Sequence, residues 1–137
     1  MSTSAKEVVK SFFQSDLLND KTTIEKYFHP ELVLIWNSMD GLTIMNYDDV
    51  VSFFDEIQRT YADLRIEMSH LLVDGNHVTV RYKYYIRTIE NPDEELGIAH
   101  FMCIWEIKDG KLYRGHQISQ PVTDLDETSE SYHKIKV

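Results

Sequence analysis

The chain has 137 residues, the size of one domain with a single core, and carries 23 acidic against 14 basic residues for a formal net charge of −9. This acidity, without a cluster of basic residues, argues against a nucleic-acid partner. One cysteine, no long apolar run and a polar N-terminus argue against a disulfide framework, a membrane span and a signal peptide. We therefore expect a cytoplasmic protein that binds neither nucleic acid nor membrane.

The first third of the chain predicts two helices and a strand. Ser4 and Glu7 form a capping-box pattern at the start of an amphipathic helix. Its apolar residues recur at helical spacing: Val8, Val9, Phe12, Phe13 and Leu17. A short helix over 22–28 follows and ends at His29-Pro30, since the residue before proline is pushed out of the helical region. Residues 32–36 are branched and aromatic and predict a strand.

The middle of the chain predicts a loop, a third helix and a hairpin. Residues 37–45 are expected to be a loop that contains a turn at Asp40-Gly41. Asn46 then resembles an N-cap, with acidic residues in the first turn. The inner side of this helix is apolar: Val50, Phe53, Phe54, Ile57 and Tyr61. The pattern changes after Asp63 to strands over 65–73 and 77–90, joined by a turn at 74–76.

The last part of the domain predicts a second hairpin. Residues 100–107 and 112–120 form two strands around a Lys-Asp-Gly-Lys turn. The domain is expected to span residues 1–122. Residues 123–137 are acidic and serine-rich and are expected to form a polar C-terminal tail.

Helices followed by a run of long antiparallel strands predict an α+β fold. Four segments carry a family resemblance: the helix with Val8-Val9 and Phe12-Phe13, the step over 27–31, the helix over 46–61, and the hairpin over 105–112. Together they resemble the nuclear transport factor 2-like superfamily, closest to its SnoaL-like, polyketide cyclase-like branch, over residues 4–122. The resemblance implies a cone-shaped fold, with a curved antiparallel or mixed sheet and about three helices on its concave face.

Such a fold encloses an apolar pocket, and strand parity indicates what lines it. The resemblance places Phe101, Cys103 and Trp105 inward on one strand, and Tyr113, Gly115, Gln117 and Ser119 inward on the next. On the strand over 77–90, Val80, Tyr82 and Tyr84 face the same core. The predicted ligand-binding residues are Phe12, Trp36, Asn37, Tyr82, Phe101, Cys103, Trp105, Tyr113 and Gln117. The alternative is that the aromatic residues simply fill the core.

The resemblance also sets an expectation about chemistry, because enzymes of this superfamily place a carboxylate in the cavity. Where SnoaL-like cyclases carry an aspartate, this chain has Gln117, and an amide cannot accept a proton at neutral pH. At positions matching the tyrosine and two aspartates of ketosteroid isomerases it has Phe12, Trp36 and Cys103. The isomerase interpretation fails on these residues, and the cyclase interpretation is weakened.

No catalytic residue is assigned from the sequence, and the remaining candidates are His116 and Gln117. His116 would turn inward if a bulge at Gly115 shifted the register, and His100 has the same outward parity. His29, before a proline, is expected to have a structural role. Cys103 is expected to be a small buried hydrophobe rather than a nucleophile. Neither histidines nor carboxylates have metal-ligand spacing, so we expect no metal and no cofactor.

The outer face of the strand over 100–107 is apolar as well, through Met102 and Ile104. A strand that is apolar on both faces needs a cover. With the helices on the concave side, the expected cover is a second copy of the sheet, as family members commonly form. A homodimer would place His100, Arg81, Arg114 and His116 in or around a two-fold interface.

Three hypotheses remain open from the sequence. The first is a dimer that binds a small apolar or aromatic molecule without an assigned reaction. The second is an enzyme of the isomerase, cyclase or dehydratase type whose base is not located. The third is a protein-interaction or assembly domain with a filled cavity.

Overall fold

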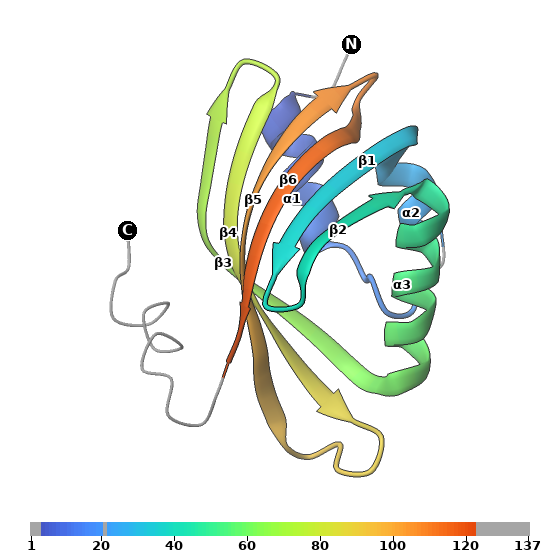
Figure 1. Cartoon of the computed structure of the whole chain (residues 1–137). Helices are drawn as coiled ribbons and strands as arrows, with labels where there is room; N and C mark the ends of the chain where they lie inside the picture. The colour runs from blue at the N-terminus through green and yellow to red at the C-terminus, as the bar shows by residue number, and fades with distance from the viewer. Residues whose placement is uncertain (1–3, 21, 123–137) are drawn as a thin grey trace.

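The computed structural model describes residues 4–20 and 22–122, and within them three helices lie against a strongly curved six-stranded sheet (Figure 1). The helices are α1 (Ala5–Gln14), α2 (Thr23–Tyr27) and α3 (Tyr47–Thr60). The strands are β1 (Phe28–Ser38), β2 (Gly41–Asn46), β3 (Tyr61–Asp74), β4 (His77–Thr88), β5 (Glu95–Lys108) and β6 (Lys111–Pro121).

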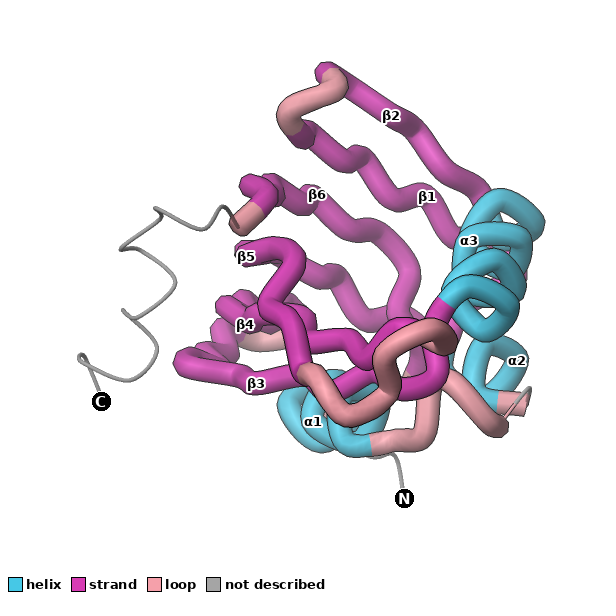
Figure 2. Tube along the Cα trace, turned by 90° about the horizontal axis from the view of Figure 1, so that it is seen from below, coloured by secondary structure: helices cyan, strands magenta, loops and turns pink. Residues whose placement is uncertain are grey.

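The strand order is β2-β1-β6-β5-β4-β3, and every neighbouring pair is antiparallel except β1 and β6, which run parallel. Viewed from below, the sheet curves around the helices, with α3 lying across its open side (Figure 2). The α+β class, the curved mixed sheet and the three helices on the concave face agree with the fold that the sequence predicted.

The two predicted helix starts are confirmed by their caps. The Ser4 side chain accepts a hydrogen bond from the backbone N–H of Glu7 at 3.3 Å. At α3, Asn46 and Asp49 form a complete capping box: each side chain accepts from the other residue's backbone N–H at 2.9 Å. The apolar faces of α1 and α3 pack toward the sheet, where Val8, Phe12, Val50 and Phe54 are buried.

Most strands are longer than the local pattern predicted, and one was missed. The segment 37–45 was expected to be a loop, but most of it belongs to β2, which pairs with β1 beyond the turn at Asp40-Gly41. Gly41 has a φ of 99°, which favours glycine there. β1 begins at Phe28 and runs through His29-Pro30, where its pairing with β6 is irregular between Phe28 and Val33, so the missing N–H of proline is tolerated.

β3 and β5 also start earlier than predicted, at Tyr61 and Glu95, because both pair along the whole length of β4. Cross-strand hydrogen bonds extended these strands into segments whose own sequence gave no strand signal. The predicted polar tail over 123–137 lies outside the described residues.

Candidate functional site

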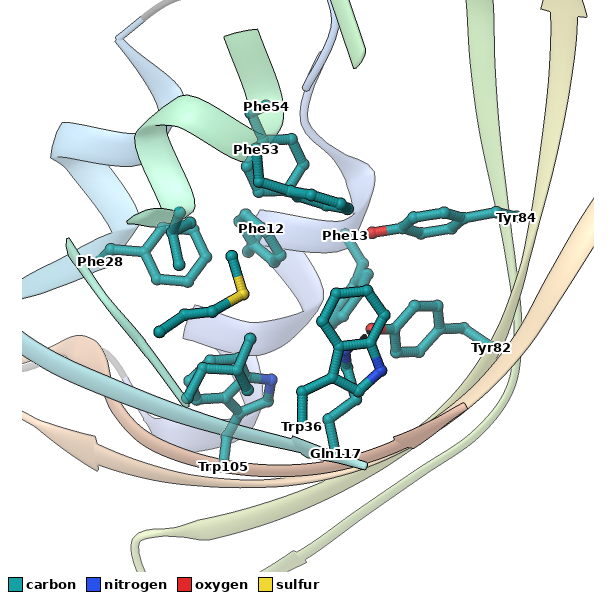
Figure 3. Close-up of a pocket in the computed structure, with 13 residues that line it drawn as sticks. Phe12, Phe13, Phe28, Trp36, Phe53, Phe54, Tyr82, Tyr84, Trp105 and Gln117 are labelled. Carbon is teal, nitrogen blue, oxygen red and sulfur yellow. Dashed lines mark hydrogen bonds between the residues drawn. The ribbon is translucent and has the colours of Figure 1, made fainter. Parts of the chain in front are cut away.

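A small cavity of about 40 Å³ lies between the concave face of the sheet and the helices (Figure 3). Aromatic rings from α1, α3, β1, β4 and β5 form most of its wall, and the amide of Gln117 on β6 is the one non-aromatic polar side chain among the residues drawn. The lining residues are Phe12, Phe13, Phe28, Leu34, Trp36, Met45, Val50, Phe53, Phe54, Tyr82, Tyr84, Trp105 and Gln117. Five predicted ligand-binding residues therefore meet at one cavity: Phe12, Trp36, Tyr82, Trp105 and Gln117.

Strand register brings the inward residues together. One row of paired residues crosses β1, β6, β5 and β4 in that order and consists of Trp36, Gln117, Cys103 and Val80. Side chains in such a row share one face of the sheet. Of this row, Cys103 is completely buried in the core and is not part of the cavity wall.

Two predicted pocket residues lie elsewhere. Tyr113 was expected to face the cavity, but the β5–β6 pairing passes from Glu106↔Arg114 to Ile107↔Leu112, which makes Tyr113 an extra residue of a bulge. Its ring packs edge-on against His29, with the centroids 4.9 Å apart. The bulge breaks the two-residue parity that had placed Tyr113 inward.

Asn37 was also expected to line the cavity, and it does not. It is exposed, because it follows the inward Trp36 and so projects from the opposite face of β1, where its register partner on β6 is Ile118. Its side chain lies with that partner at a hollow on the outer face of the sheet.

Gln117 and Tyr82 form the polar centre of the cavity. The Tyr82 hydroxyl donates to Oε1 of Gln117 at 2.7 Å, and Gln117 is only 7% exposed. Burial raises the pKa of the neighbouring Tyr84 well above its usual value, with a smaller contribution from Cys103, so its hydroxyl stays neutral at physiological pH. These groups offer hydrogen bonds, but none of them is a base at neutral pH.

A larger hollow of about 330 Å³ adjoins the cavity, and we call it the mouth. The two spaces share Trp36, Phe53 and Tyr84, so these rings stand between them. Phe101, a predicted ligand-binding residue, lines the mouth and stacks on Tyr82 with the ring centroids 4.9 Å apart. The Trp36 indole donates from Nε1 to Oγ of Ser119 at 2.7 Å, which holds the ring in place.

Asp40 is the one charged side chain in the described wall of the mouth. The sequence predicted a turn at Asp40-Gly41, and this turn between β1 and β2 carries Asp40 to the rim.

The histidine candidates do not enter the cavity. His116 is exposed on the outer face, between Ile35 and Ile104 in the register, because the bulge precedes Gly115 rather than occurring at it. His29 accepts from the backbone N–H of Glu31 at Nδ1 (3.0 Å), and its Nε2 lies 3.2 Å from Asp109. Both ring nitrogens of His29 are thus used in local structure.

Cys103 has the environment of an inert thiol. Desolvation by burial is the main effect on its pKa and raises it far above the usual value. A thiol that does not ionise is neither a nucleophile nor a metal ligand. Within residues 4–20 and 22–122, no group of three or more His, Cys, Asp or Glu side chains could hold a metal ion.

Several lining residues were not among the predicted site residues. Phe53, Phe54 and Tyr84 were assigned only to the inner faces of their elements, and Ser119 only to the inward parity of its strand. Helical or strand spacing shows that a residue faces inward. Whether it borders a cavity or packs in the core depends on the shapes of its neighbours.

Comparisons with known proteins agree with this architecture. The model of the SnoaL-like domain family matches residues 9–115. No curated protein sequence matches the chain. Within the described part, no helix has the length and apolarity needed to cross a membrane.

Solved structures with the same fold have low sequence identity. The putative polyketide cyclase IdmH from Streptomyces antibioticus is 12% identical, with a TM-score of 0.70 over 85% of this chain and 92% of that one. AclR, a putative hydroxylase from Streptomyces galilaeus, is 13% identical, with a TM-score of 0.70 over 96% and 97%. An LEH-like epoxide hydrolase from M. tuberculosis is 13% identical, with a TM-score of 0.66 over 84% and 81%.

At these identities the solved structures show the shared fold and leave the chemistry of this chain to its own residues. The family model covers most of the chain: it begins within α1, includes the β1–β2 hairpin, α3 and strands β3 to β5, and ends within β6 before Gln117. The chain belongs to the family of SnoaL-like domains, which have the nuclear transport factor 2-like fold.

Proposed function

We propose that this protein binds a small apolar or aromatic molecule in the space between the sheet and the helices. The observation that carries the proposal is the buried Gln117–Tyr82 pair inside a wall of aromatic rings. Small-molecule sites are typically apolar spaces with a few placed polar groups. The single cysteine, a buried thiol, supports a reducing compartment, and we propose the cytoplasm.

The cavity and its mouth differ in size and would therefore hold different parts of a ligand. A volume of about 40 Å³ accommodates roughly three water molecules, since each needs about 10–15 Å³. The mouth, at about 330 Å³, falls at the lower end of ordinary ligand pockets, roughly 300–1,000 Å³. A ring of the ligand therefore occupies the mouth, beside Trp36 and Phe101, and a small substituent extends inward.

The second candidate is an enzyme of the isomerase, cyclase or dehydratase type. Asp40 favours it, as the one carboxylate at the described wall of the mouth. The structural neighbours named cyclase, hydroxylase and epoxide hydrolase share only the fold with this chain. The enzyme is supported if the protein converts a bound ligand and Asp40→Asn abolishes this turnover without weakening binding. Binding without turnover supports the first candidate.

Intrinsic fluorescence tests the binding proposal directly, because both tryptophans of the chain, Trp36 and Trp105, line the cavity. A bound apolar ligand is expected to change this emission and to raise the melting temperature. Trp36→Phe keeps an aromatic wall and isolates the signal of Trp105. If a library of ring compounds changes neither emission nor melting temperature, the cavity is filled core, and the assembly-domain hypothesis takes its place.

We also propose that the outer face of the sheet pairs with a second copy of the chain. One register row runs across all six strands through Ile44, Ile35, His116, Ile104, Thr79 and Leu72. The adjacent row runs through Leu42, Asn37, Ile118, Met102, Arg81 and His70. We call these two rows the outer band; its apolar members are largely exposed, with Ile118 at 66%.

Polar rows flank the outer band on both sides, which supports this choice of partner. Arg114, Glu106 and His77 lie in the row beyond Ile104, and His100 and Lys83 lie in the row beyond Met102. An apolar centre with a polar rim is the usual anatomy of a protein interface. A two-fold pair buries the same patch on both copies and needs no other protein.

A further inference from the structure

The oxygen and the nitrogen of the Gln117 side-chain amide differ in their hydrogen bonding. Its Oε1 accepts from the Tyr82 hydroxyl, as Figure 3 shows. Among the hydrogen bonds of the described residues, none is donated by its Nε2, although the residue is 7% exposed. An unsatisfied buried donor destabilises the folded protein, so the position favours a partner that the protein does not supply.

The surroundings restrict the charge of that partner. The described walls of the cavity and its mouth contain no Lys, Arg or His side chain, and their one charged group is the carboxylate of Asp40 at the rim. A buried anion needs a compensating cation, and this site offers none. The group that meets Gln117 is therefore a neutral acceptor.

The path to Gln117 limits the size of the ligand group that can reach this amide. Trp36 and Gln117 are register partners on β1 and β6, and Trp36 borders both the cavity and its mouth. The cavity itself holds only a few atoms beyond the Trp36 ring. A single oxygen on the edge of a ring fits this arrangement, with the ring in the mouth and the oxygen inside.

We propose that the ligand is a neutral ring compound bearing a carbonyl oxygen, and that this oxygen accepts a hydrogen bond from Nε2 of Gln117. The inference rests on the proposed function, since it names the ligand class for the same cavity. It gives Gln117 a positive role: the amide recognises an acceptor where a carboxylate would repel one.

Three bicyclic compounds of nearly equal shape separate the possibilities: indane has no polar group, indole has only a donor, and indanone has only an acceptor. Titrations followed by nuclear magnetic resonance give their dissociation constants. We expect indanone to bind at least about tenfold more tightly than indane, which corresponds to about 1.4 kcal/mol. The side-chain amide resonances of Gln117 are expected to shift with indanone and to stay in place with indane.

The Gln117→Leu variant keeps the size of the side chain and removes the donor. It is expected to reduce the affinity for indanone to that for indane and to leave indane binding unchanged. Gln117→Met serves if the leucine variant does not fold, and the amide resonances test the wild-type protein without any substitution. Gln120→Leu is the control, because it makes the same change at an exposed residue of β6 outside the cavity and its mouth, and it should retain the preference for indanone.

Equal binding of indanone and indane by the wild type, or a preference for indole, would overturn the inference while leaving a binding cavity in place. Survival of the indanone preference in Gln117→Leu would overturn it as well. If none of the three compounds binds, the proposed function fails, and this inference fails with it.

Discussion

The Tyr82 hydroxyl reaches Oε1 of Gln117 at 2.7 Å across β5, the strand that separates their own strands β4 and β6. The residue of β5 in the Gln117 row is Cys103, whose small side chain leaves room for this contact. The bond therefore ties together strands that share no backbone ladder, at the centre of the concave face.

A double-mutant cycle measures this contact. Tyr82→Phe leaves Oε1 of Gln117 buried without its donor and is expected to lower the free energy of unfolding by about 1–3 kcal/mol. Adding Gln117→Leu removes both partners, so the double variant should lose less than the sum of the two single losses, with a coupling of about 1 kcal/mol. Urea denaturation gives the four values; additive losses would mean that the two groups do not interact.

Gly115 is expected to tolerate no side chain. A Cβ at this position would lie 2.7 Å from Cζ3 of Trp105 and 2.8 Å from Cδ1 of Leu34, both in the packed core. Gly115→Ala should cost about 1–3 kcal/mol of stability by overpacking. Gly97→Ala is the matched control, because the atoms nearest to its Cβ would be the far end of the Lys83 side chain at 2.7 Å and the Tyr85 ring at 3.5 Å, rather than the apolar core. Equal losses for the two variants would contradict the prediction.

Tyr85 should make stability depend on pH in the alkaline range. Burial, helped by the hydrogen bond that its hydroxyl donates to Glu67 at 2.9 Å, raises the pKa of Tyr85 to about 12. The folded state then holds the proton more tightly than the unfolded state, whose pKa is near 10.0. This contribution is fully present below pH 10 and is lost as the pH rises toward 12.

Tyr85→Phe is expected to flatten the fall in unfolding free energy over that range, as measured by urea denaturation at a series of pH values. Tyr113→Phe, which removes a hydroxyl outside this cluster, is the control. An unchanged slope in the Tyr85 variant would show that its proton is not linked to folding.

A charged substitution in the outer band is expected to convert the proposed dimer to a monomer. Ile104→Lys places a charge at the centre of the proposed interface and should shift the protein from dimer to monomer in sedimentation equilibrium. Ile89→Lys makes the same change at an isoleucine that is 58% exposed and outside the band, and it should leave the dimer intact. A wild-type protein that is monomeric at every concentration would refute the interface.

Cys103 should be inert in the folded state. Its thiol is completely buried, and burial raises its pKa, so little thiolate exists at pH 8. Reaction with a colorimetric thiol reagent is expected to be negligible in the native protein and complete in denaturant. Rapid labelling without denaturant would mean that the core opens often enough to expose β5.

Much of this architecture was predictable because its signals are local. Ser4 and Asn46 cap their helices by contacts within three residues, and the alternation of β4 identified Val80 and Tyr82 as inward. The same alternation placed Gln117 inward and His116 outward, and the bulge did not change this because it precedes Gly115. Short-range sterics and hydrogen bonds determine such features, so the sequence carries them directly.

The features that the sequence did not predict depend on contacts between segments far apart in the chain. β2 forms because β1 offers it a ladder, and Tyr113 leaves the cavity because the β5–β6 pairing gains one residue. The sequence by itself determined the fold family and the inward position of the Gln117 amide. Only the tertiary structure decided that the amide has a tyrosine on one side and an open donor on the other, because packing between elements places those atoms.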